Sequence, residues 1–89
     1  MPESIIRRIL NKIKWDTKEN ISEYEIVFLH RGAPNELKTY PAERIKEIKA
    51  SYIVFYDEEA EDEEVIIPFH RIRRIYNKAK KEIIWEKES

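Results

Sequence analysis

The sequence predicts an α+β fold, with an N-terminal amphipathic helix packed on a strongly bent antiparallel sheet or small open barrel of about six to seven short strands. Three observations predict it. Residues 4–14 repeat apolar side chains at helical spacing, whereas the later apolar segments are short and rich in β-branched and aromatic residues. The third is length, since 89 residues allow a single domain, residues 1–89, with one core.

The predicted helix carries a stripe of isoleucine and leucine that covers an arc of about 140° at ~100° per residue. Its members are Ile5, Ile6, Ile9, Leu10 and Ile13. Ser4 can cap the first turn, and the basic residues of the last turn suit the helix dipole. A membrane-surface or partner helix shows the same pattern, but we expect the stripe to pack on the sheet. We also expect Trp15 and Trp85 in the core.

Short strands are predicted along the rest of the chain. Residues 24–30 form the clearest one, because apolar side chains point to both of its faces at its middle. Gly32 and Pro34 mark a turn, after which residues 37–40 form the return strand. Further strands are expected from Ile45 and at residues 52–56, 65–67, 72–76 and 82–85, with hairpin turns at residues 50–51, 57–64 and 77–81.

One motif occurs twice, 27 residues apart. The copies are Tyr40-Pro41-Ala42-Glu43-Arg44-Ile45 and Ile67-Pro68-Phe69-His70-Arg71-Ile72, and Ile48 then matches Ile75. Each copy follows one short apolar segment and precedes another, so we predict two similar units of strand, tight turn and strand.

Charge is distributed unevenly along the chain. Seven of the 18 acidic residues lie in residues 57–64, which leaves 11 acidic against 17 basic residues elsewhere, a net charge of +6, although the whole chain has −1. This permits a polyanionic partner, while the acidic run resembles a solvated hairpin tip. The high charge and the lack of cysteine fit a thermophilic protein. No signal peptide or membrane span is recognisable, so we expect a cytoplasmic protein without a membrane partner.

Histidine and arginine stand side by side at two of the predicted turns. The first pair is His30-Arg31, followed by Gly32, the only glycine, and the second pair is His70-Arg71. Arginine grips phosphate oxygens with a planar fork, imidazole adds a directional donor, and glycine lets backbone amides approach an anion. The two His–Arg pairs therefore permit a phosphate site. The simpler alternative is that both arginines pair with surface carboxylates.

Other chemistry has less support. Two histidines could act as acid and base on a phosphodiester, but the His-x-Thr or His-x-Ser pairs of two-histidine phosphoesterases are absent. Without cysteine, only carboxylates could complete a metal site, and none is suitably spaced, so we expect no metal and no cofactor. Aromatic residues could stack on RNA bases, yet most are needed for the core.

Four segments occur in a recognisable order. They are Asn11-Lys12-Ile13-Lys14-Trp15-Asp16, Tyr24-Glu25-Ile26-Val27-Phe28-Leu29-His30-Arg31-Gly32-Ala33, Ile67-Pro68-Phe69-His70-Arg71-Ile72 and Ile83-Ile84-Trp85. Together they resemble the RNA cyclic group end recognition domain, a small, mostly archaeal and long uncharacterised family. The resemblance covers nearly the whole chain. It implies binding of RNA ends that carry a cyclic phosphate, and related domains are fused to RNA-processing modules.

The resemblance places site residues at His30, Arg31, Gly32, His70 and Arg71, with Trp15 and Asp16 in support. Our hypothesis is a non-catalytic module that binds an RNA 3′ end, with both His–Arg pairs on the terminal phosphate. Arg44, Arg73 and Arg74 are further candidates for contacts with the flanking backbone. The alternatives are an enzyme that opens the cyclic phosphate and a protein-interaction module in an RNA-processing complex, whose acidic run contacts a basic partner. No preference concerning DNA follows from the sequence, and the hypothesis requires the two pairs to meet in space.

Overall fold

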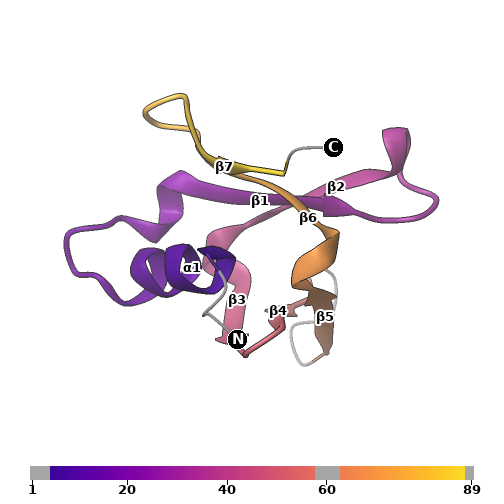
Figure 1. The fold of residues 1–89 in the computed structure, drawn as a ribbon, viewed down its shortest axis with the longest axis horizontal. Coiled ribbons are helices and arrows are strands. Elements are labelled where there is room, and N and C mark those ends of the chain that lie inside the picture. The colour runs from indigo at the N-terminus through magenta and orange to yellow at the C-terminus, as the bar shows by residue number, and fades with distance from the viewer. Residues whose placement is uncertain (1–4, 58–62, 88–89) are drawn as a thin grey trace.

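The computed structural model describes residues 5–57 and 63–87 (Figure 1). In these ranges one α-helix, α1 (Ile5–Trp15), precedes seven strands: β1 (Tyr24–Leu29), β2 (Leu37–Pro41), β3 (Ile45–Ile48), β4 (Tyr52–Tyr56), β5 (Glu64–Pro68), β6 (Ile72–Asn77) and β7 (Glu82–Glu86). Short 3-10 helices lie between them: η1 (Ile21–Glu23), η2 (Pro34–Glu36), η3 (Ala42–Arg44) and η4 (Phe69–Arg71). None of the described helices is long and apolar enough to span a bilayer.

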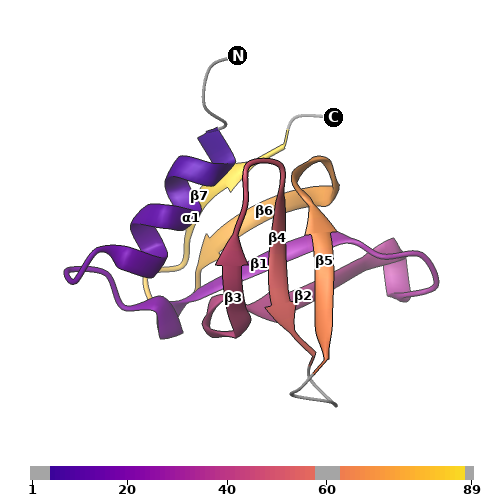
Figure 2. The same ribbon diagram turned by 90° about the horizontal axis from the view of Figure 1, so that it is seen from below.

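The strands form two antiparallel sheets. One sheet has four strands in the order β2-β1-β6-β7, and the other has three in the order β3-β4-β5. Figure 2 shows the strands of the smaller sheet crossing those of the larger one, with α1 beside β3. The predicted α+β class, the N-terminal helix and the antiparallel strands are confirmed. The strong bend that the sequence predicts takes the form of two separate sheets, and these do not close into a barrel.

Both copies of the Pro-x-x-Arg-Ile motif form corners at which the chain passes from one sheet to the other. η3 joins β2 to β3, and η4 joins β5 to β6. The preceding prolines have nearly the same φ and ψ, −67° and 141° at Pro41 and −61° and 146° at Pro68. Equivalent side chains are buried at both corners: Tyr40 and Ile67, Ala42 and Phe69, Ile45 and Ile72. The motif therefore repeats because the fold needs two sheet-switching corners.

The repeat extends into the hairpins that precede the corners. In β1–β2, Ile26 faces Tyr40 and Leu29 faces Leu37, and in β4–β5 the residues 27 positions later, Ile53 with Ile67 and Tyr56 with Glu64, face one another in the same way. The His30 amide donates to the Glu36 carbonyl at 2.8 Å, as the Asp57 amide does to the Glu63 carbonyl at 3.0 Å. In the described ranges, residues 24–48 are thus matched by residues 51–57 and 63–75, two copies of one unit. The predicted hairpin across the acidic run is confirmed at its base, while residues 58–62 lie outside the described ranges.

The core lies between the two sheets and the helix. Ile6, Leu10 and Ile13 bring the buried stripe of α1 to it. The rings of Phe28, Tyr40 and Phe55 pack together, with centroids 5.1 Å apart for Phe28–Tyr40 and 5.2 Å apart for Tyr40–Phe55. Because Phe28 and Tyr40 belong to the larger sheet and Phe55 to the smaller, this contact joins the sheets and adds to their apolar burial.

Trp15 departs from the expected core position. Its side chain is 71% exposed. Residue 15 follows Ile13 by two positions, a rotation of about 200° around a helix, which turns it away from the buried stripe. Trp85, in contrast, is half-buried and packs against the core.

Candidate functional site

The pairing of β1 with β6 brings together two turns that are far apart in the sequence. Phe28 faces Ile72 at the end of this antiparallel pair. Because the strands run in opposite directions, the residues after Phe28 lie beside the residues before Ile72. His30 is therefore brought near η4, which carries His70 and Arg71, at one end of the larger sheet.

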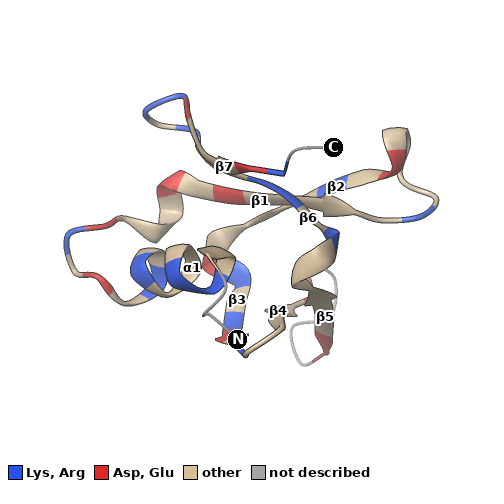
Figure 3. Ribbon diagram, in the orientation of Figure 1, with Lys and Arg blue, Asp and Glu red and all other residues tan. Residues whose placement is uncertain are grey.

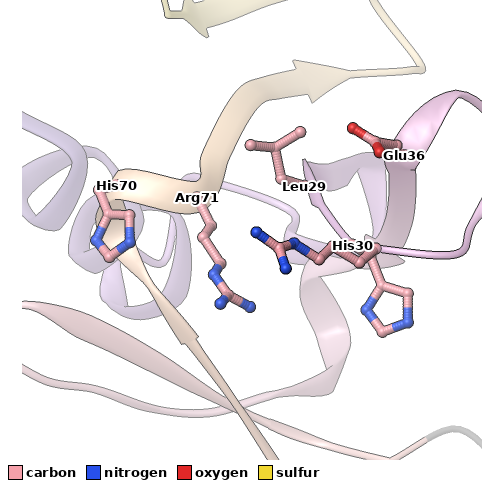
Figure 4. Close-up of a pocket in the computed structure, with 6 residues that line it drawn as sticks. Leu29, His30, Glu36, His70 and Arg71 are labelled. Carbon is pink, nitrogen blue, oxygen red and sulfur yellow. The ribbon is translucent and has the colours of Figure 1, made fainter.

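These turns line an open pocket of about 330 Å³. The lining residues are Leu29, His30, Arg31, Glu36, His70 and Arg71. In the view of Figure 4 the Arg71 side chain lies between His70 on one side and His30 on the other. Both predicted His–Arg pairs thus share one pocket, although they come from different turns.

The four His and Arg side chains of the pocket are exposed. Within residues 5–57 and 63–87 they form no hydrogen bond or ion pair, and the ion pairs of these ranges are Lys46–Glu64, Lys49–Glu47 and Arg74–Glu86. His30 only contacts the edge of the Phe28 ring, at 6.4 Å between centroids. The alternative in which Arg31 and Arg71 are occupied by carboxylates therefore does not hold in the described part of the chain.

The loop after β1 has left-handed backbone at three positions. Gly32 has a φ of 90°, and Asn35 and Glu36 have φ of 58° and 57°. The amides of Ala33 and Glu36 donate within the loop, to the carbonyls of His30 at 3.2 Å and of Ala33 at 2.8 Å. Glycine adopts such φ values without steric strain. Gly32 therefore shapes the turn but does not itself line the pocket.

Arg44 and Arg71 hold the same position in the two corners but have different surroundings. Nη2 of the half-buried Arg44 donates to the backbone carbonyl of Asp57 at 2.8 Å. Arg71 is exposed and has no such bond to another described residue. The backbone of the corner thus forms whether or not its arginine is bonded, which leaves the guanidinium of Arg71 available to a ligand.

The other predicted contributors lie outside the pocket lining. The Asp16 carboxylate accepts a hydrogen bond from the Lys18 amide at 2.9 Å and closes the turn after α1. Trp15 lies under the Lys14 ammonium, 5.3 Å from the ring centroid. Arg74 pairs with Glu86, Arg73 is half-buried, and Arg44 bonds to Asp57. The lining of the pocket therefore includes four of the proposed contact residues, and the others do not line it.

Leu29 and Glu36 also line the pocket, although neither is among the predicted site residues. The signal that could have found them is the hairpin register. Leu29 faces Leu37, so residues 30 and 36 stand opposite one another at the mouth of the loop. An apolar wall and a carboxylate consequently stand beside the two His–Arg pairs.

The pocket suits an oxyanion. Figure 3 shows basic residues at η4 and along the first part of β6. Two guanidinium groups can each present paired donors to phosphate oxygens, and two imidazoles can add single donors. No group of three His, Cys, Asp or Glu side chains that could hold a metal ion occurs among the residues that the structure describes.

Comparison with known proteins gives a consistent relationship. Residues 4–87 match the family described as the MJ1316 RNA cyclic group end recognition domain. The UPF0248 protein MmarC7_1289 of Methanococcus maripaludis is 36% identical over 83 residues, 93% of this chain and 99% of that protein. UPF0248 protein MJ1316 of Methanocaldococcus jannaschii is 34% identical over 84 residues, which covers 94% and 95% of the two chains. A UPF0248 protein of Thermococcus onnurineus is 36% identical over 86 residues, 97% of this chain and 88% of its own. No solved structure gives a significant match.

Proposed function

The chain belongs to the MJ1316 RNA cyclic group end recognition domain family, and from this premise we propose that it is a non-catalytic module that binds RNA 3′ ends bearing a 2′,3′-cyclic phosphate. One observation carries the proposal. Two His–Arg pairs line one open pocket, and their side chains have no hydrogen bond or ion pair to the described part of the chain. The family name indicates the ligand, and the pocket has donors suited to it.

Each group of the pocket has a role in this proposal. The guanidinium groups of Arg31 and Arg71 hold the non-bridging phosphate oxygens, where paired N–H donors match paired acceptors. The imidazoles of His30 and His70 donate to the remaining oxygens. Leu29 contacts the apolar edge of the terminal ribose. A cyclic phosphate carries one negative charge and leaves no free 2′-hydroxyl, so these donors favour it over a 3′-hydroxyl end.

Binding to three oligonucleotides of one sequence tests the proposal. They end in a 2′,3′-cyclic phosphate, a 3′-phosphate and a 3′-hydroxyl. We expect the cyclic end to bind most tightly. Equal affinity for all three would eliminate end recognition and leave only general RNA binding.

Substitutions in the pocket test which residues carry recognition. His70→Ala and Arg71→Ala should each weaken binding of the cyclic end by about tenfold to a hundredfold, because a hydrogen bond to a charged group is worth about 1.5–3 kcal/mol. The matched control is Arg8→Ala, which removes an exposed arginine of α1 outside the pocket. If Arg71→Ala and Arg8→Ala had the same effect, the pocket would have no special part in binding.

The presence of both histidines in one pocket favours a second candidate, an enzyme that opens the cyclic phosphate. One imidazole would accept a proton from water, the other would protonate the leaving ribose oxygen, and an arginine would stabilise the negative charge that builds up on the non-bridging phosphate oxygens. Cyclic-ended RNA should then be converted to a phosphomonoester at some pH between about 5 and 8, and His30→Ala and His70→Ala should each prevent the conversion. No turnover across that range would exclude the enzyme and leave the binding module.

A further inference from the structure

Glu36 is the acidic member of a pocket whose other polar lining groups are two arginines and two histidines. Its side chain is exposed, and within the described ranges it forms no ion pair with Arg31 or Arg71. In Figure 4 it lies on the β1–β2 side of the pocket, apart from His70 and Arg71 of η4. Its negative charge is therefore not neutralised by a bonded cation and can act on a bound anion.

The backbone of the loop fixes the position from which the Glu36 side chain extends. Glu36 has a φ of 57°, a left-handed conformation that a non-glycine residue keeps only where its surroundings impose it. Two bonds impose it here. The Glu36 carbonyl accepts from the His30 amide at 2.8 Å, and its amide donates to the Ala33 carbonyl at 2.8 Å. Residues held in left-handed backbone are often found at binding sites. Here the hydrogen bonds of the loop hold the backbone of Glu36 beside the pocket.

RNA 3′ ends with phosphate differ in charge. A 2′,3′-cyclic phosphate is a diester with one ionisable proton fewer than a monoester, so it carries one negative charge. A 3′-phosphate is a monoester whose second pKa lies near 6, and its charge at pH 7 is about −1.5 to −2. A carboxylate beside the phosphate therefore repels the monoester more strongly than the cyclic diester.

We propose that Glu36 determines the specificity of the pocket by rejecting the dianionic 3′-phosphate end while it tolerates the monoanionic cyclic end. Arg31 and Arg71 supply two positive charges, which suffice for one negative charge on the ligand together with that of Glu36. A second negative charge on the ligand leaves the pocket with an excess of negative charge. This inference rests on the proposed RNA-end function and adds a selection by charge that the two His–Arg pairs alone cannot provide, because they attract both ends.

The test uses Glu36→Gln, which keeps the size of the side chain and removes its charge. Affinities are measured for RNA that ends in a cyclic phosphate, in a 3′-phosphate, and in the methyl ester of a 3′-phosphate, an open monoanion. At pH 7.5 the substitution should raise the affinity for the 3′-phosphate about threefold to tenfold more than that for the cyclic end, which is the effect expected of one additional unit charge at a solvated site. The methyl ester should respond as the cyclic end does.

The matched control is Glu63→Gln. Glu63 holds the equivalent position in the other hairpin, where its carbonyl accepts from the Asp57 amide, and it does not line the pocket. Glu63→Gln changes the net charge by the same amount as Glu36→Gln, but outside the pocket. It should therefore leave the preference between the cyclic end and the 3′-phosphate unchanged. The proposal is overturned if Glu36→Gln leaves the ratio of the two affinities within twofold of wild type, or if the methyl ester gains as much as the 3′-phosphate. If wild-type protein binds no phosphate end at all, the proposed function itself fails and the inference fails with it, a result distinct from an unchanged ratio.

Discussion

Arg44 and Arg71 show at the scale of single residues how one motif can serve two purposes. Arg44 bonds to the carbonyl of Asp57, which belongs to the hairpin of the second copy. Arg71 lines a pocket with His30 and Arg31, which belong to the hairpin loop of the first copy. Each arginine therefore lies toward the loop of the other copy, but only one is bonded within the described ranges. Structural and binding effects should separate when the two are replaced.

Arg44→Ala should lower the free energy of unfolding by about 1 kcal/mol and leave RNA binding unchanged. A bond from a charged donor is worth about 1.5–3 kcal/mol, but Nε of the same guanidinium is buried without a described partner, which offsets part of that gain and lowers the net value to about 1 kcal/mol. The melting temperature should fall by about 4–8 °C. Arg71→Ala should leave the melting temperature within about 2 °C, since exposed substitutions cost little. A reversed pattern, with Arg71 stabilising and Arg44 neutral, would contradict the assignment of roles.

Gly32→Ala tests whether the loop needs glycine for its backbone. No heavy atom lies within 4 Å of the Cβ that alanine would add, so the cost comes from the φ of 90° alone. We expect a loss of about 1–2 kcal/mol in the free energy of unfolding, measured by urea denaturation. Asn35→Gly is the control, since it relaxes a φ of 58° that asparagine tolerates, and it should change the stability by less than about 0.5 kcal/mol. Wild-type stability in Gly32→Ala would mean that the loop backbone is free to move.

At the scale of elements, the sequence predicted most of the fold because local patterns determine helices and hairpins. The stripe of isoleucine and leucine predicted residues 4–14, and α1 spans Ile5–Trp15. The expected strands all occur, with ends that match or differ by one residue. The core position predicted for Trp15 is wrong, because residue 15 lies on the side of the helix opposite the buried stripe although its ring is apolar.

Tyr24, at the start of β1, links that strand to the segment after α1. Its hydroxyl donates to the Glu19 carboxylate at 2.6 Å. Burial first, and then this hydrogen bond, raise the pKa of Tyr24 above its ordinary value near 10. The fold therefore favours the neutral phenol, and the resulting stability is fully present below pH 10 and is lost as the pH rises above it.

Tyr24→Phe should consequently lower the free energy of unfolding by about 1 kcal/mol at pH 8, where the hydrogen bond is intact. The difference between wild type and variant should narrow as the pH rises from 10 to 11, because only wild type loses the phenol proton. Chemical denaturation at pH 8, 9, 10 and 11 measures both curves. A difference that stays constant over this range would show that the bond does not depend on the ionisation of Tyr24.

At the scale of the whole molecule, the site depends on a contact that the sequence does not specify. Hairpins follow from turns and alternation, but nothing local indicates that β1 pairs with β6, whose residues lie more than 40 positions away. This pairing brings His30 near His70. The residue types of the site could therefore be predicted from the two turns, whereas their convergence and the presence of Leu29 and Glu36 required the three-dimensional structure.

Binding of a polyanion such as RNA should also depend on the concentration of salt. Because released counterions drive such binding, the logarithm of the association constant should fall linearly with the logarithm of salt concentration. Arg71→Ala should reduce the slope by about 0.7 to 1 unit if its guanidinium holds one phosphate. Titrations of cyclic-ended RNA at several salt concentrations measure this, with Arg8→Ala for comparison. A slope that is the same in both variants and in wild type would place the phosphate elsewhere.

The two copies of the hairpin also make the scaffold open to redesign. Residues 30–36 and 57–63 begin and end at matching registers and close with the same amide-to-carbonyl bond. Grafting the first loop onto the second hairpin, together with Glu43→His at the other corner, would place two further His–Arg pairs at the second corner, where the bond of Arg44 to the carbonyl of residue 57 must be released before its guanidinium can hold a ligand. A protein of 89 residues could in this way be made bivalent for terminal phosphates without a new backbone.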